Sequence, residues 1–509
     1  MQFAQNKPIR LQERQKSFMV SFDMENHQQK REKFLVQLRK SKRQENYSVR
    51  RSRVQMLSFP SEILFFNPHF EQLGVLEQLD CLGNLLLEGP PHLVLPALQA
   101  LRSINNSMDL YLIRSMLNKG IINLILNYTD LSFNDQTTSE ALWIICNISA
   151  GDGLSTWLVS MGVLDLCLNS ISESRPLSSE NAIWTLSNLI ADDERIREVA
   201  LHEFKLHDFL VSFLQKVKHT LPIVKVIAFA LSNLSKGSYK LQYSVFESFM
   251  YAFKQLLTYT DTQILYDSLT GISHLISEDH KRCQSLINYQ LVPKMLGFTH
   301  SKLEFPILKI MGHISSGEEK QTDYILHQGL LDYLLEKTQS KKSKVRRSAY
   351  WVLSNIAAGN FYQRNQFLEH SILDQAVQGL NDTSYSVRKE VSYIFSNLGF
   401  LCSQNEILKL CSPELFESIE KALHDLDPKL VLNILGFIKA VLDSCDLENT
   451  ELITSLLAET ECINSVESLN AHINDTISSF SKELCKTYYE LVSDTDEEVQ
   501  ETIEVFDFS

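Results

Sequence analysis

The stretch ALWIICNIS at residues 141–149 decides the fold, because variants of it recur through the middle of the chain. Six further versions are AIWTLSNLI (182–190), AFALSNLS (228–235), SLTGISHLI (268–276), ILKIMGHIS (307–315), AYWVLSNIA (349–357) and VSYIFSNLG (391–399). Each version has one polar residue near its end, and we call its place the key position. The key residues are Asn147, Asn188, Asn233, His274, His313, Asn355 and Asn397.

The key residues recur at a nearly constant interval. Their spacings are 41, 45, 41, 39, 42 and 42 residues, a period typical of armadillo or HEAT repeats. The residues two before and one after the key position are apolar in every version. They predict a helical stripe that neighbouring repeats bury. The predicted fold is therefore all-α, an armadillo-repeat, right-handed superhelical solenoid of about ten repeats.

A second helical stripe joins each key residue to the residues four and seven positions before it. The residue four before is aromatic in five versions: Trp143, Trp184, Phe229, Trp351 and Tyr393. Asparagine is a poor residue inside a helix, and we expect this stripe to face outward rather than into the core. One such pair alone would be explained by capping and packing between repeats, and that alternative remains open. Five pairs in register favour a binding surface.

The residue types on this stripe suit an extended peptide. Stacked helices lie ~8–10 Å apart and a strand rises ~3.3 Å per residue, so each helix would meet two or three peptide residues. Asparagine has one acceptor and two donors for the peptide backbone. Neighbouring aromatic rings would hold a lysine stem and attract its ammonium group. Carboxylates that would select cations are Glu140, Asp192, Asp267 and Glu390.

The repeated Trp-x-x-x-Asn pattern resembles the importin α (karyopherin α) family, whose armadillo solenoids bind nuclear localisation signals. The resemblance implies a major signal site at Glu140, Trp143, Asn147, Thr156, Asn181, Trp184, Asn188, Asp192, Phe229, Asn233 and Asp267. Asp192 matches the aspartate that takes the key lysine of the signal. Phe229 stands where the family has tryptophan.

The resemblance also implies a minor site, at Trp351, Asn355, Glu390, Tyr393 and Asn397. Here the chain departs from the family. Tyr393 replaces a tryptophan, His313 replaces an asparagine, and Ser348 replaces a glutamate directly after Arg346 and Arg347. Positive charge beside a lysine site repels the ligand. We predict a working major site and a weak or altered minor site.

The first 55 residues are strongly basic, with fourteen Lys or Arg against five Asp or Glu, in a chain of net charge −14. Such an arm alone would suggest nucleic-acid binding. However, IRLQERQKSF (9–18) and KREKFLVQLRKSKRQENYSVRRSR (30–53) resemble the importin-β-binding segment of importin α. The implied binding and autoinhibitory residues are Arg10, Lys30, Arg31, Arg39, Lys40, Lys42, Arg43, Arg50, Arg51 and Arg53. Val49 replaces the lysine expected in the Asp192 pocket. Either the arm docks in a shifted register through Arg50 and Arg51, or self-inhibition is weak, and the charge argument favours weak self-inhibition.

The sequence divides into a basic arm (1–55), a linker (56–69), armadillo repeats (70–493) and an acidic tail (494–509) expected to lack regular structure. The implied partners are importin β, cargo proteins with nuclear localisation signals and, by resemblance only, an export receptor with Ran-GTP. The protein is expected to shuttle between cytoplasm and nucleus. Nucleic acid is not an expected partner.

The sequence carries no pattern for catalysis. HEFKLH at 202–207 places its histidines five residues apart, whereas HExxH requires four. The nine cysteines form no CxxC pair, which favours a reducing compartment. No enzyme activity, cofactor, metal or membrane insertion is expected. The alternatives are an armadillo scaffold for another extended partner and a nucleic-acid-associated protein.

Overall fold

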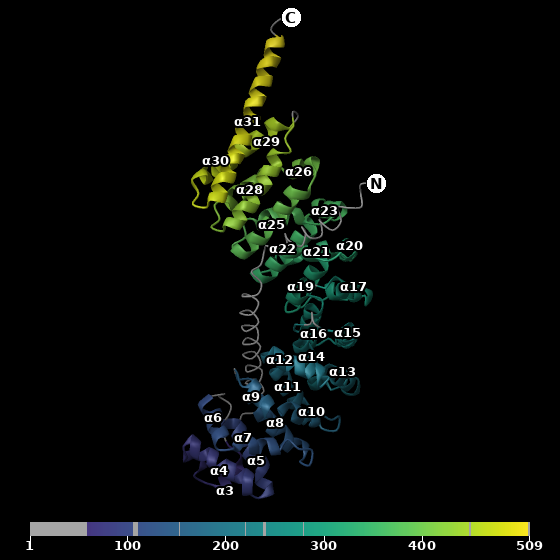
Figure 1. Cartoon of the computed structure of the whole chain (residues 1–509), viewed down its shortest axis with the longest axis vertical. Helices are drawn as coiled ribbons and strands as arrows, with labels where there is room; N and C mark the ends of the chain where they lie inside the picture. The colour runs from purple at the N-terminus through teal and green to yellow at the C-terminus, as the bar shows by residue number, and fades with distance from the viewer. Residues whose placement is uncertain are drawn as a thin grey trace. The chain divides into compact units, whose positions relative to one another are not determined.

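The computed structural model describes residues 59–104, 110–151, 153–218, 220–237, 241–277, 279–446 and 449–506. Side chains are described as far as residue 493, apart from that of Asp192. Over these residues the chain forms α-helices and two short 3₁₀ helices and no β-strand (Figure 1). The predicted all-α solenoid is therefore confirmed.

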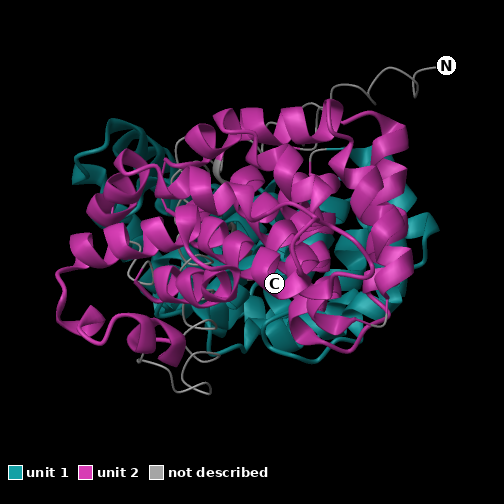
Figure 2. Ribbon diagram, turned by 90° about the horizontal axis from the view of Figure 1, so that it is seen from below, with its two compact units in different colours: residues 1–15, 278–509 teal, residues 16–277 magenta. Residues whose placement is uncertain are grey.

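The described residues fall into two compact units. In chain order, we call residues 59–277 the first unit (magenta in Figure 2, unit 2 of its key) and residues 279–506 the second unit (teal, unit 1 of the key). The first unit contains α3 (Ser61–Phe66), η1 (Phe70–Gln72), α4 (Val75–Glu88), α5 (Pro91–Ile104), α6 (Leu110–Asn118), α7 (Ile121–Asn127), α8 (Asp135–Ser149), α9 (Ser155–Ser160), α10 (Val163–Asn169), α11 (Pro176–Asp192), α12 (Glu194–His202), α13 (Leu206–Val217), α14 (Leu221–Leu234), α15 (Tyr243–Leu256) and α16 (Thr262–Leu275).

The second unit begins after the fourth key helix. It contains α17 (His280–Asn288), α18 (Val292–Leu296), α19 (Glu304–Ser315), α20 (Glu319–His327), α21 (Leu330–Thr338), α22 (Ser343–Ala357), α23 (Phe361–Leu368), α24 (Ile372–Gly379), α25 (Tyr385–Leu401), α26 (Gln404–Leu410), α27 (Pro413–Leu423), α28 (Pro428–Leu442), α29 (Thr450–Glu459), α30 (Cys462–Ser468), η4 (Leu469–Ala471) and α31 (Asp475–Phe506).

The helices that carry the key residues form the spine of each unit. In the first unit α8, α11, α14 and α16 pack each on the next, and in the second unit α19, α22 and α25 do the same, with α28 packed on α25 as the next long helix. Local signals start several of them: the Asn134 side chain accepts a hydrogen bond from the Thr137 backbone N–H, and Pro176 opens α11. The repeat period thus becomes a stack of long helices.

The predicted core stripe is confirmed. The residues two before the key position are at most 1% exposed: Ile145, Leu186, Leu231, Ile272, Met311, Leu353 and Phe395. Burying one such side chain stabilises a fold by about 1.5–3 kcal/mol. Because the stripe recurs on every key helix, each repeat is held mainly by its neighbours.

Two segments differ from the sequence prediction. Within the predicted linker, Ser61–Phe66 form α3, Ile63 is buried, and the Phe59 ring lies 4.9 Å from that of Phe70. The acidic tail was expected to lack regular structure, and this is wrong over most of its length because α31 continues to Phe506. Its Glu and Gln residues are good helix formers, and the packed start of α31 supplies the nucleus.

The predicted basic arm, residues 1–55, lies outside the described residues. This includes every arm residue named above: Arg10, Lys30, Arg31, Arg39, Lys40, Lys42, Arg43, Arg50, Arg51 and Arg53. All nine cysteines are described, and all are free thiols. No helix in the part of the chain that the structure describes combines the length and apolar composition needed to cross a bilayer.

Candidate functional site

The predicted major-site aromatics lie on three successive packed helices of the first unit. Trp143 is on α8, Trp184 on α11 and Phe229 on α14, and all three side chains are partly exposed. Each precedes its asparagine by four residues, about one helical turn. We call one aromatic with its asparagine a rung, and the three rungs together the first ladder.

Two asparagines of the first ladder, Asn188 and Asn233, tie their repeats to the preceding one. Asn188 Nδ2 donates to the Cys146 carbonyl oxygen at 3.2 Å and to Ser149 Oγ at 2.7 Å. Asn233 Nδ2 donates to the Ser187 carbonyl oxygen at 3.1 Å. These acceptors lie about one repeat earlier in the chain, so the amide nitrogen crosslinks neighbouring helices.

This geometry corrects the expectation that the asparagines face outward. Asn147 is 6% exposed, Asn188 4% and Asn233 0%. The alternative that each asparagine caps and packs between repeats therefore holds for the amide N–H groups of Asn188 and Asn233. Contact of these asparagines with a peptide backbone stays a prediction. The aromatic side chains supply the accessible surface of the stripe.

The first rung already holds a cation of the protein itself. The Arg102 guanidinium, from α5, has its Cζ 4.1 Å from the Trp143 ring centroid. Its Nε lies 2.6 Å from Glu140 Oε2. Burial raises the pKa of Glu140, and the charge and hydrogen bond of Arg102 oppose that rise. Arg102 precedes the seven aligned repeats, so the repeat pattern in the sequence does not point to it.

The next two rungs are in contact. The Trp184 and Phe229 ring centroids lie 6.4 Å apart, with the planes at 56°, within the range of aromatic pairs. Thr156 is exposed on α9, a short helix that contacts α11. Asp192 is the last residue of α11, and its side chain lies outside the description.

Other predicted major-site residues are also enclosed. Asn181 Nδ2 donates to the carbonyl oxygen of Ser139 at 3.1 Å and to its Oγ at 3.0 Å. Asp267 is 2% exposed and accepts a hydrogen bond from Gln263 Nε2 at 2.9 Å. Both residues therefore hold helix geometry in this structure, and their contact with a ligand remains a prediction.

The predicted minor site lies within the second unit, and we call its two rungs the second ladder. Asn355 Nδ2 donates to the Gly312 carbonyl oxygen at 3.2 Å and to Ser315 Oγ at 3.0 Å. Asn397 Nδ2 donates to the Ser354 carbonyl oxygen at 3.0 Å. The inter-repeat bond of the first ladder is therefore repeated. Asn355 Oδ1 is buried and has no hydrogen-bond partner among the described residues.

The arginines before Ser348 are bound to carboxylates of the next repeat. Arg346 pairs with Asp382 through two hydrogen bonds of 2.6 and 2.7 Å. Arg347 Nε lies 3.0 Å from Glu390 Oε1. The carboxylate that the sequence assigned to cation selection in the second ladder is thus engaged by a native guanidinium.

Trp351 is packed tightly against the preceding repeat. A Cβ atom added to Gly312 would lie 1.9 Å from Trp351 Cζ3, so only glycine leaves room for the indole. The Trp351 ring also meets the His313 ring edge-on at 6.0 Å. Burial, and secondarily the charge of Lys309, lowers the pKa of His313 to about 3. The histidine at this key position is therefore neutral at pH 7.

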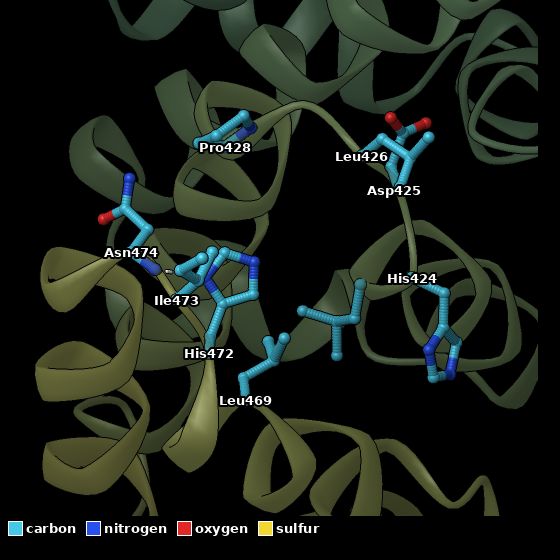
Figure 3. Close-up of a pocket in the computed structure, with 9 residues that line it drawn as sticks. His424, Asp425, Leu426, Pro428, Leu469, His472, Ile473 and Asn474 are labelled. Atoms are coloured by element: carbon cyan, nitrogen blue, oxygen red, sulfur yellow. Dashed lines mark hydrogen bonds between the residues drawn. The ribbon is translucent and has the colours of Figure 1, made fainter.

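A separate pocket lies in the second unit, between the loop before α28 and the loop before α31. Its volume is about 590 Å³, and Figure 3 shows Leu426, His472 and Ile473 among the side chains around it. Leu426 is 98% exposed and Ile473 97%. Across the described ranges, no three His, Cys, Asp or Glu side chains gather to hold a metal ion, and His202 and His207 lie on different helices.

No protein-family model matches the chain. Its sequence is similar to importin subunits alpha. Importin subunit alpha-3 of Arabidopsis thaliana is 24% identical over 355 residues, covering 66% of this chain and 64% of that protein. Importin subunit alpha-1a of Oryza sativa subsp. japonica is 23% identical over 354 residues, covering 68% and 66%. The matched part therefore spans just under two thirds of each relative.

The fold also has a solved counterpart. An engineered protein from the Northeast Structural Genomics Consortium superposes with a TM-score of 0.68 at 16% identity, covering 82% of this chain and 99% of that one. At that identity the likeness concerns the fold alone. It agrees with the all-α architecture described above.

Proposed function

We propose that this chain is a peptide-binding adaptor of the importin α type. It holds an extended lysine- or arginine-rich segment, such as a nuclear localisation signal, along the first ladder. The observation that carries the proposal is the regular row of partly exposed aromatics, Trp143, Trp184 and Phe229, on three packed helices. The similarity to importin subunits alpha supports it.

The first rung supports the proposed cation chemistry. An arginine stacked on an indole and paired with a carboxylate is the contact that a cargo cation would make. In the same proposal Asp192 and Asn188 meet the cargo at the following rungs, and the buried Asn233 holds the third rung in place. The second ladder binds more weakly, because Arg347 engages Glu390.

The same proposal assigns partners to the rest of the chain. Residues 1–55 bind importin β, and cargo release is coupled to an export receptor with Ran-GTP, so the protein shuttles between cytoplasm and nucleus. The relatives are named as transport subunits rather than as enzymes, which supports a binding role without catalysis.

A binding experiment tests the proposal. Fluorescence polarisation of a labelled lysine-rich peptide should give saturable binding that weakens about tenfold in Trp184→Ala, because stacking and cation–π contacts are lost. Asp192→Lys should abolish binding through charge repulsion. Leu426→Ala, far along the chain from the first ladder and fully exposed, is the matched control and should bind as the wild type does.

A pull-down separates the alternatives. Importin β should be captured by the full chain and lost when residues 10–53 are deleted. An armadillo scaffold of another kind would bind neither importin β nor the basic peptide. A nucleic-acid-associated protein would bind RNA or DNA through residues 1–55 and ignore the peptide, and either result would overturn the proposal.

A further inference from the structure

We propose that Arg102 closes the first rung of the first ladder to cargo, so that the ladder reads basic side chains only from Trp184 onward. The cargo class is then a short basic cluster rather than a long one. This inference rests on the proposed function, and it adds a specificity-determining residue to the first ladder.

The contacts of Arg102 use both cation-binding groups of the rung. Its guanidinium lies 4.1 Å from the Trp143 ring centroid, well within the range of a cation–π contact. Its Nε lies 2.6 Å from Glu140 Oε2, a short charge-assisted hydrogen bond. The Arg102 side chain is 22% exposed and that of Glu140 is 11% exposed. A lysine of a peptide would have to displace this arginine to reach the same indole face and carboxylate.

Displacement is unfavourable because Arg102 is part of the chain. A tethered group has an effective concentration on the order of millimolar or more. A free cargo at micromolar concentration competes poorly against it for an equivalent site. Separating Arg102 from Glu140 would also leave the guanidinium charge without its partner in a mostly enclosed place, and this costs free energy.

The second ladder contains the same arginine–carboxylate pair. Arg347 on α22 bonds Glu390 on α25 at 3.0 Å, and the Glu390 side chain is 7% exposed. In each unit, an arginine on the preceding long helix therefore engages the carboxylate seven residues before a key asparagine. In both units, therefore, an arginine of the chain itself engages the carboxylate of this stripe.

A peptide-length series tests the inference on the full chain. Labelled peptides with two, four and six consecutive lysines are titrated against the wild type, Arg102→Ala and Arg102→Lys. In the wild type, affinity should level off between four and six lysines. In Arg102→Ala the six-lysine peptide should gain about three- to tenfold, because an indole face and a carboxylate become available. Arg102→Lys keeps a cation in place and should behave as the wild type.

Two controls make the result specific. Lys225→Ala removes one positive charge from the same unit by breaking the 2.8 Å pair of Lys225 with Asp261. Because the lost charge acts on every lysine of the peptide, affinity should rise slightly and smoothly with peptide charge, without a selective gain for the six-lysine peptide. Adding Glu140→Gln to Arg102→Ala should reduce the gain, because the carboxylate is lost while the Trp143 indole stays available. Circular dichroism melting confirms that each variant is folded.

The possible failures are distinguishable. If the wild type binds none of the peptides, the proposed function is wrong. If the wild type binds them but Arg102→Ala gives the same dependence on length, only the inference about Arg102 is wrong. An affinity that grows by a constant factor up to six lysines in the wild type would also overturn it.

Discussion

Replacing Asn188 with alanine should lower both stability and peptide affinity, and the structure gives the size of the first effect. Asn188 is 4% exposed and its Nδ2 donates two hydrogen bonds, at 3.2 Å to the Cys146 carbonyl oxygen and at 2.7 Å to Ser149 Oγ. A hydrogen bond contributes about 0.5–1.5 kcal/mol net, so losing both should cost about 2 kcal/mol. For a unit of this size that corresponds to about 4–8 °C in the unfolding midpoint.

The control is Gln78→Ala, because Gln78 is a buried amide in the same unit and away from the ladder. Its Nε2 donates one hydrogen bond, at 3.1 Å, to the Phe70 carbonyl oxygen. The expected loss is about 1 kcal/mol, or about 2–4 °C. Thermal unfolding followed by circular dichroism gives the stabilities, and fluorescence polarisation well below both midpoints gives peptide affinity.

The two variants should separate packing from recognition. Asn188→Ala should bind a lysine-rich peptide at least tenfold more weakly, whereas Gln78→Ala should bind it as the wild type does. An unchanged unfolding midpoint in Asn188→Ala would refute the idea that this amide ties two repeats together. Equal loss of affinity in both variants would show that binding only follows stability.

Three further predictions concern the second unit. Gly312→Ala should displace the Trp351 indole, since the new Cβ would lie 1.9 Å from its Cζ3. We expect thermal unfolding to show about 1–3 kcal/mol of destabilisation. An unchanged tryptophan emission spectrum would contradict the displacement. Burial raises the pKa of Asp382, but the hydrogen bonds from Arg346 and the Ser384 N–H, together with the charges of Arg346 and Arg388, outweigh that effect and leave the pKa below its ordinary value. The ionised Asp382 carboxylate therefore contributes stability that is present above the unfolded carboxyl pKa and is lost as the pH falls through the folded pKa. Between pH 7 and pH 3 the urea unfolding midpoint should drop less in Asp382→Asn than in the wild type. Burial raises the pKa of Cys283 to about 12, so this thiol should resist alkylation at pH 8 in the folded protein; rapid modification, seen by mass spectrometry, would show that it is reachable as a thiolate.

The sequence predicted the helices and the core well because both follow from periodicity. An apolar residue two before each key position becomes buried wherever a helix packs on a similar helix, and Ile145 and Leu353 show this in the two units. The partly exposed aromatics were predicted for the same reason. Their exposure follows from their place on the helix, which the sequence alone determines.

The hydrogen bonds of the asparagines could not be predicted in the same way. Asn188 and Asn355 each donate to a backbone carbonyl oxygen and to a serine hydroxyl about one repeat earlier. The backbone group leaves no mark in the sequence, and the serines, Ser149 and Ser315, do not reveal their partners by themselves. The ion pair of Arg102 with Glu140 could not be predicted for a related reason. It depends on the direction in which a long side chain from another repeat points. Contacts between repeats are set by the distance between helices, which periodicity does not give.

The double use of the asparagines links recognition to stability. An amide whose N–H groups are held by the preceding helix keeps its side chain in one orientation, so a peptide that packs against this helix loses less entropy on binding. A peptide held at the rungs from Trp184 onward would also bridge α11 and α14, and its binding would stabilise their packing. At a concentration of one hundred times the dissociation constant this adds about 2.7 kcal/mol, comparable with the cost expected for removing Asn188. A bound basic peptide should therefore raise the unfolding midpoint of the wild type by about as much as Asn188→Ala lowers it. At the same peptide concentration it should stabilise that variant by at most about half as much, because binding is at least tenfold weaker.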